Sequence, residues 1–182
     1  MYAFEALRAR LVATHSSWRT ADAVLLLLRV GLGVTFVAHG GQKLFNWINV
    51  DPHGISGTTK FFDFVGIPAP HFFAWVVGLT EFIGGLVLIV GLLTSVAAIA
   101  LTIDMIVAIA TYNASNGFFT ETPNGGWELN FIIALGMVTL AALGPGRLSA
   151  DAALGLTRSS TTKDERPRFA STTAARETVR QP

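Results

Sequence analysis

The chain has 182 residues, of which 51% are hydrophobic and 14% are charged, and its formal net charge is +1. This composition is typical of an integral membrane protein and does not fit a soluble single domain. Positive charge collects at the two ends of the chain, which argues against nucleic acid as a partner. The chain has no cysteine, so disulfides, thiol redox chemistry and iron–sulfur ligation within this polypeptide are excluded.

Residues 1–22 form a basic leader before the first hydrophobic segment. Its arginines continue to Arg19, and the apolar run that follows is long enough to span a bilayer, so the leader lacks the layout of a cleavable signal peptide. Phe4, Leu7, Leu11 and Trp18 recur at roughly helical spacing, which predicts a cytoplasmic amphipathic helix on the membrane surface. A basic leader without this role is the alternative.

A membrane-spanning helix needs about 20 mainly apolar residues, and four segments of this chain meet that requirement. They are residues 23–45, 72–93, 95–112 and 127–143. We therefore predict an all-α fold, an integral membrane four-helix bundle, with a membrane domain over residues 23–151. Only a turn near residues 91–95 separates the second and third segments, which predicts a tight antiparallel hairpin.

Two loops and a tail complete the predicted domain organisation. In the loop 46–71, the aromatic run 61–64 is followed by Gly66, Pro68 and Pro70, a pattern that predicts a short interfacial helix with a firm stop. The loop 113–126 is rich in glycine and should cap the bundle at the membrane surface. Residues 152–182 are polar enough to predict a disordered basic cytoplasmic tail.

The orientation is predicted from the positive charges near the spans. Lys and Arg residues precede the first span and follow the fourth span. The loops 46–71 and 113–126 hold only Lys60. The N and C termini should therefore both be cytoplasmic. The expected location is a multi-pass protein of the bacterial plasma membrane.

Ionisable residues within the spans are the candidate functional residues, because a charge near the bilayer centre costs at least about 2.5 kcal/mol and needs a partner. Their positions along the helices predict pairs of Glu81 with His39, of Asp104 with Arg29 and of Lys43 with Glu128. Together they form a predicted intramembrane polar cluster of Arg29, His39, Lys43, Glu81, Asp104 and Glu128. The alternative is that these pairs only hold the helices in register.

Haem and metal are not favoured by the histidine pattern. A haem between helices needs two ligands at matched depth, and only His39 lies clearly within a span, while His71 lies at the entrance of another. No cofactor is expected to be covalently bound and no metal ligands are assigned. A quinone is a compatible ligand for the polar cluster.

Spaced motifs along the spans carry a family resemblance. They include His39-Gly40 with Lys43-Leu44-Phe45, then Gly66-Ile67-Pro68, Glu81 with Gly85 and Gly91, Gly126-Trp127-Glu128, and Gly144-Pro145-Gly146-Arg147 followed by Ser149 and Asp151. In this combination the chain resembles the DoxX family of small bacterial membrane proteins, over about residues 25–151. The resemblance implies a four-helix membrane protein linked to redox metabolism, related to the small membrane subunit of a thiosulfate:quinone oxidoreductase. It supplies no catalytic residues to carry over.

Three functions of different classes are compatible with the sequence. The first is a quinone-linked electron-transfer subunit in oxidant defence, at most a subunit of an oxidoreductase, in which Arg29 or His39 donates to the quinone and Glu81 exchanges protons. The second is a non-catalytic anchor for soluble redox enzymes such as a sulfurtransferase or superoxide dismutase. The third is a small-solute or proton pathway. The expected partners are the lipid bilayer and either soluble redox enzymes or another membrane subunit, and a homo-oligomer is compatible.

Overall fold

The computed structural model describes residues 18–47, 54–121 and 125–156. Within these ranges every regular element is a helix and no strand occurs. The predicted amphipathic helix of the leader and the predicted disorder of the tail beyond residue 156 lie outside the described residues.

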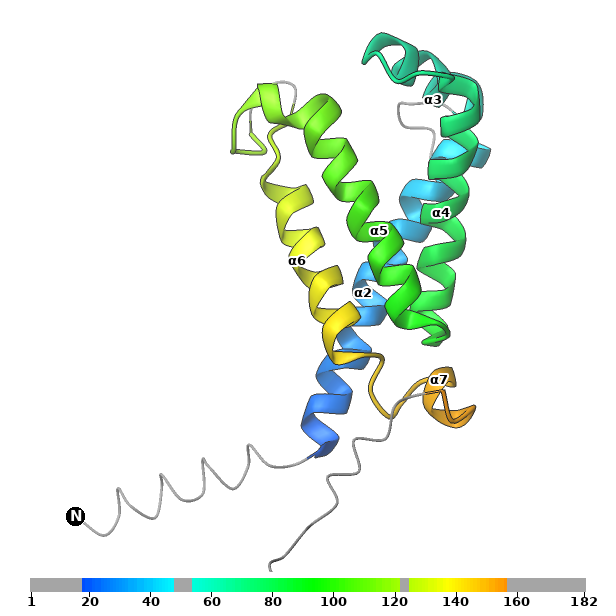
Figure 1. The fold of residues 1–182 in the computed structure, drawn as a ribbon, viewed down its shortest axis with the longest axis vertical. Coiled ribbons are helices and arrows are strands. Elements are labelled where there is room, and N and C mark those ends of the chain that lie inside the picture. Colours follow the sequence, from blue (N-terminus) through cyan, green and yellow to red (C-terminus); the bar gives the residue numbers. More distant parts are fainter. Residues whose placement is uncertain (1–17, 48–53, 122–124, 157–182) are drawn as a thin grey trace, which may run out of the picture.

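Four long helices make up the body of the molecule (Figure 1). They are α2 (Trp18–Phe45), α4 (Pro70–Val90), α5 (Thr94–Ala108) and α6 (Glu128–Leu143). A π-helical turn (Ile109–Asn113) and a 3-10 turn (Ala114–Asn116) extend α5, while α3 (Gly54–Phe64) and the short α7 (Ala150–Ala153) lie at opposite ends of the bundle. We refer to these as the α3 end and the α7 end.

The predicted membrane helices are confirmed as elements. Three helical stretches, Thr20–Phe45, Pro70–Val90 and Thr94–Asn116, are long and apolar enough to cross a membrane, and α6 is a shorter apolar helix. At about 1.5 Å per residue, the 16 residues of α6 extend about 24 Å. Because the two turns after α5 extend that helical stretch to Asn116, α6 is the shortest of the four predicted spans.

Glycine and proline set the helix boundaries where the sequence indicated turns. Helix α4 begins with Pro70 and ends at Gly91, whose φ of 76° is a left-handed conformation that favours glycine. Leu93 also has a positive φ, 47°, and α5 begins directly after it. The α4–α5 hairpin is therefore as tight as predicted. The short helix predicted in the loop 46–71 is present as α3, and it is followed by Gly66 with a φ of 79°.

Helices α2 and α4 pack against each other along a seam of glycines. A Cβ atom at Gly33 would lie 2.8 Å from the Gly85 carbonyl oxygen, and one at Gly85 would lie 2.7 Å from the Gly33 carbonyl oxygen. At Gly40 a Cβ atom would overlap the backbone nitrogen of Phe82. The two backbones approach this closely only because these positions lack side chains, as in other small-residue contacts between membrane helices.

Helices α5 and α6 form the second pair, and the two pairs meet around an apolar core at the α7 end. This core combines buried side chains from all four long helices: Phe36, Leu88, Ala97, Ala98, Leu101, Met105, Met137 and Leu140. Toward the α3 end the α5–α6 pair diverges from the α2–α4 pair (Figure 1). The four long helices consequently pack together at the α7 end and separate into two pairs toward the α3 end.

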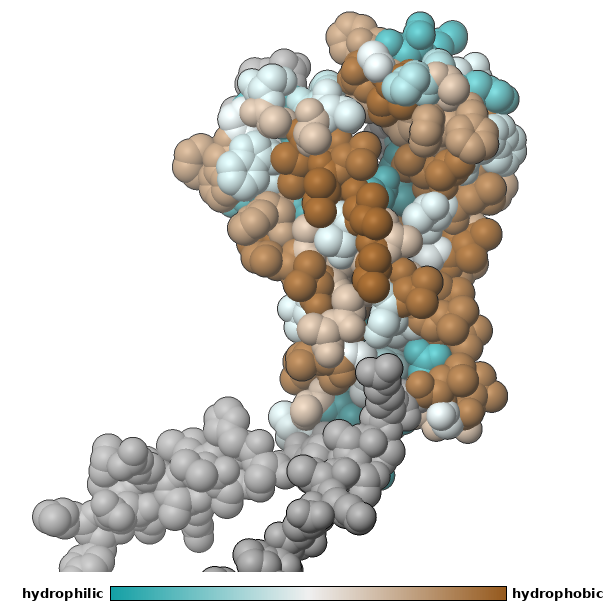
Figure 2. Space-filling model, viewed as in Figure 1, coloured by the Kyte–Doolittle hydropathy of each residue, from teal (hydrophilic) through white to brown (hydrophobic). Residues whose placement is uncertain are grey.

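The outer surface of the bundle is largely hydrophobic (Figure 2). Leu27, Val34, Ile83, Ile99 and Ile132 are each more than half exposed. Large apolar side chains that point away from the core on every long helix are what lipid contact requires. The helices are thus embedded in the bilayer.

Candidate functional site

A buried ion pair joins the two tightly packed helices. The Lys43 ammonium Nζ donates to both carboxylate oxygens of Glu81, at 2.7 Å from Oε1 and 2.5 Å from Oε2. The Glu81 side chain is 4% exposed and that of Lys43 is 16% exposed. Taking either charge out of water alone would cost several kcal/mol, so each group stabilises the other in this setting.

A second carboxyl group, Asp104 on α5, faces this ion pair. Asp104 interacts electrostatically with Glu81 and Lys43. Its Oδ2 atom is buried and has no hydrogen-bond partner in the described part of the chain. We call Lys43, Glu81 and Asp104 the Lys43 cluster.

The Lys43 cluster can hold a proton as well as an ion pair. One ammonium group faces two carboxyl groups, so the cluster is electrically neutral when one carboxyl carries a proton. An ammonium group has three N–H donors, and a carboxyl group with an unpaired oxygen can accept a further hydrogen bond. The arrangement can therefore bind a small polar group and exchange a proton with it.

The sequence did not predict these pairings correctly. Lys43 pairs with Glu81 and not with Glu128. Glu128 lies in the first turn of α6, where its Oε2 accepts from the Thr120 backbone nitrogen at 3.4 Å. His39 interacts electrostatically with both Lys43 and Glu81, but within the described residues it forms no ion pair with Glu81. The His39 side chain is exposed and lies on the same face of α2 as Lys43, four residues away.

Arg29 lies at the α7 end, apart from Asp104, which corrects the predicted pair. It is fully buried, and its Nη2 donates to the Leu148 carbonyl oxygen at 2.6 Å. Gly91 leaves the space for the guanidinium, since a Cβ atom there would overlap Nη1. The acid that acts on Arg29 is Asp151. Arg29 is therefore part of a contact between the bundle and the segment that follows α6.

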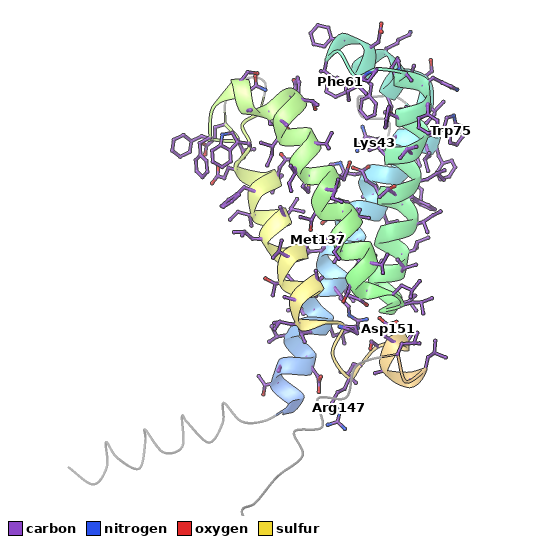
Figure 3. The ribbon with its side chains drawn as sticks, viewed as in Figure 1. Lys43, Phe61, Trp75, Met137, Arg147 and Asp151 are labelled. Atoms are coloured by element: carbon purple, nitrogen blue, oxygen red, sulfur yellow. The ribbon has the colours of Figure 1, made fainter. Side chains whose placement is uncertain are left out.

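Asp151 is the residue that the sequence analysis of the polar cluster missed. Its two carboxylate oxygens accept from the backbone nitrogens of Leu93 at 2.8 Å and Thr94 at 3.0 Å (Figure 3). These nitrogens begin α5 and have no partner within the helix, so Asp151 caps it. The signal available in the sequence was the Ser149-Ala150-Asp151 segment after the last span, in which Ser149 Oγ caps α7 by accepting from the Ala152 nitrogen.

The described residues contain no group of three or more His, Asp or Glu side chains placed to hold a metal ion. His71, the second histidine considered for haem, has its Nδ1 3.3 Å from the Thr59 hydroxyl.

Taken with the apolar surface, these features define a helical membrane protein that holds a partly buried lysine and two acids between its spans. Comparison with known proteins then places it: the DoxX family matches residues 24–114, and the chain belongs to the DoxX family. No solved structure matches the chain.

Two relatives are similar over most of the chain. The protein named putative oxidoreductase CatD from Bacillus subtilis is 32% identical over 126 residues, which cover 69% of this chain and 83% of that protein. The protein named uncharacterized membrane protein Rv3486 from Mycobacterium tuberculosis is 31% identical over 137 residues, covering 70% of this chain and 78% of that protein. The family resemblance predicted from the sequence is confirmed.

Proposed function

We propose that this DoxX protein is the membrane subunit of a quinone-linked redox system of the bacterial plasma membrane, and that the Lys43 cluster binds the quinone head group. The observation that carries the proposal is the buried Asp104 Oδ2 without a hydrogen-bond partner, next to a lysine–glutamate pair within the membrane domain. The name of the Bacillus subtilis relative, a putative oxidoreductase, supports the same class of function.

The roles of the residues follow from their chemistry. Lys43 would donate an N–H to a quinone carbonyl oxygen, and Asp104 would accept from a quinol hydroxyl through Oδ2. Glu81 and Asp104 would move the protons, because quinone and quinol differ by two electrons and two protons. The electrons would pass to or from a partner redox enzyme, since this chain has no cysteine for thiol redox chemistry or iron–sulfur ligation.

The position of Arg29 changes one part of the sequence-based hypothesis. Arg29 is held against Gly91 and Leu148 at the α7 end, whereas the Lys43 cluster lies on the other side of the apolar core. The donor to the quinone in this proposal is therefore Lys43, with His39 as a second candidate at the edge of the cluster. Arg29 has a structural role.

Binding of a short-chain quinone to the purified protein tests the proposal. Ubiquinone-1 and menadione would be titrated into the detergent-solubilised protein, and binding would be followed by calorimetry. Lipids extracted from the purified protein would be searched for quinone by mass spectrometry. We expect saturable binding to the natural sequence and at least about a tenfold loss of affinity, about 1.4 kcal/mol, in Asp104→Asn or Glu81→Gln.

Glu128→Gln is the matched control, because Glu128 is also an acid on a long helix but lies outside the Lys43 cluster. It should bind quinone as the natural sequence does. Equal binding by the Asp104, Glu81 and Glu128 variants would contradict the assignment of the site. Absence of saturable binding by the natural sequence, with the fold verified by circular dichroism, would contradict the proposed function itself.

A further inference from the structure

The two halves of the bundle give the Lys43 cluster very different surroundings. Below it, toward the α7 end, lies the apolar core, in which Leu88, Leu101 and Met137 are fully buried. Asp104 and Leu101 are three residues apart and therefore neighbours on one helix, so the part of the core on the α7 side of Asp104 begins one turn away. The buried polar residues at this end, Arg29 and Thr94, lie beyond this core, next to Gly91 and Asp151. A proton would have to cross a closely packed hydrocarbon layer to leave toward the α7 end.

Toward the α3 end the same helices leave a groove. On α2, Leu28 and Leu32 lie close to Gly136 of α6, and His39 follows Leu32 by two turns on the same face. His39 is nevertheless exposed, because α6 has moved away at that level. The two residues of α6 that are buried, Met137 and Leu140, both belong to its α7-end half.

Polar groups line this groove. Figure 2 shows hydrophilic atoms recessed between hydrophobic walls in the half of the molecule nearest α3. Lys43 is partly exposed there. Thr58 of α3 is fully buried against the Lys43 backbone, with its hydroxyl 3.5 Å from the Lys43 carbonyl oxygen, so it does not itself face the groove. At the mouth, the rings of Phe61 on α3 and Tyr112 on the turn after α5 meet edge to face with centroids 5.0 Å apart. Phe61 is labelled at this position in Figure 3.

We propose that water and protons reach the Lys43 cluster from the α3 end, through the groove between the α2–α4 and α5–α6 pairs, and not from the α7 end. The apolar core acts as the seal on one side, and the Phe61–Tyr112 contact narrows the mouth on the other. Protons gained or lost by Glu81 and Asp104 then exchange with one compartment. With the orientation predicted from the positive charges, that compartment is the outer one.

This inference concerns access to the cluster, and only its consequence for quinone protons rests on the proposed function. The cluster could bind quinone without one-sided access, and it could have one-sided access without binding quinone. The two proposals can therefore fail separately. The test therefore uses no quinone.

Substituted-cysteine labelling provides the test, since the chain has no native cysteine. Ala108 and Ala97 form a matched pair on α5. Ala108 lies four residues from Asp104 toward the α3 end, and Ala97 lies seven residues from Asp104 toward the α7 end. Ala108 is half-buried and Ala97 is 8% exposed. The probe is a positively charged, membrane-impermeant methanethiosulfonate, applied to intact cells and to inside-out vesicles. Ser56→Cys and Ser115→Cys, both exposed at the α3 end, show which preparation presents that end.

We expect Ala108→Cys to react from the same side as Ser56→Cys and at least about tenfold faster than Ala97→Cys from either side, because thiol reactivity requires access. His39→Cys and Leu88→Cys repeat the comparison on α2 and α4, in case one variant of the first pair fails to fold. Reaction of Ala108→Cys from the side opposite Ser56→Cys would overturn the proposal. So would equal rates for Ala108→Cys and Ala97→Cys, or reaction of Ala97→Cys from the α7 end.

Discussion

In the half of the bundle near α7, each of the four long helices contributes fully or nearly fully buried apolar side chains, and Asp151 and Arg29 tie the segment after α6 to the α4–α5 turn. In the half near α3, the same helices separate into two pairs, and buried or half-buried polar groups take the place of the apolar core. The comparison shows that the four long helices share their apolar core near α7, whereas the buried apolar residues near α3, Leu44, Phe62 and Ala74, lie on α2, α3 and α4. Regions with fewer buried apolar contacts are also those from which moving and ligand-binding parts are drawn.

The largest effect is expected at the glycine seam that runs through both halves. In Gly40→Ala the added Cβ atom would overlap the Phe82 backbone and force α2 away from α4, so the free energy of unfolding should fall by about 3 kcal/mol. Gly31→Ala is the control, because nothing lies within 4 Å of a Cβ atom there. It should be neutral or slightly stabilising. Thermal unfolding in detergent measures both variants, and equal stability would show that the seam is looser than described.

The α7 half is tested by Asp151→Ala. The change removes the acceptor for two backbone N–H groups at the start of α5 and the charge that acts on Arg29. A loss of about 2 kcal/mol is expected from the unpaired N–H groups. Asp63→Ala, at an exposed position on α3, should change stability little. If the two variants unfold at the same temperature, Asp151 does not hold this half closed.

Glu81→Gln separates stability from function in the α3 half. An amide can still accept from Lys43, so the fold should survive with a loss of about 1 to 2 kcal/mol. An amide cannot exchange a proton at neutral pH, so quinone turnover with the partner enzyme present, or resistance to oxidants in cells, should be lost. Activity is compared at matched membrane levels of the protein. Full activity in Glu81→Gln would show that the Lys43–Glu81 ion pair only holds α2 and α4 together.

The smallest change in stability is expected at the mouth of the groove. Phe61→Leu removes an edge-to-face contact worth about 1 kcal/mol and keeps an apolar side chain. Its readout is kinetic: labelling of Ala108→Cys should become faster in the Phe61→Leu background, while labelling of Ser115→Cys stays the same. An unchanged rate at both positions would show that the ring contact does not narrow the mouth.

Most of the fold could be predicted from the sequence, because the signals are local. Apolar runs set the long helices, and Gly66, Pro70 and Gly91 set where they begin and end. The pairings of ionisable groups could not be predicted in the same way. Position along a helix gives depth, but not the direction in which the helix is turned toward its neighbours. Lys43 reaches Glu81 across the α2–α4 seam because glycines bring the two backbones together.

Arg29 was assigned to the wrong partner for a different reason. Its partners lie beyond the last span, in a segment that folds back against the α4–α5 turn. A search for partners restricted to the spans could not find Leu148 or Asp151. The function of the cluster could be narrowed but not fixed by sequence, because its residue types suit proton exchange, ligand binding and helix locking equally well.

The Asp151 cap also imposes an order on the assembly of the chain. The backbone N–H groups of Leu93 and Thr94 are made early, but the carboxylate that satisfies them follows 58 and 57 residues later, after α5 and α6 have been synthesised. During synthesis the α4–α5 turn thus reaches the membrane surface before this acceptor exists, and its N–H donors are left to water. Asp151 can accept from the Leu93 and Thr94 nitrogens only after the last of the four long helices has been synthesised. The contacts at the α7 end are therefore completed after all four long helices are present.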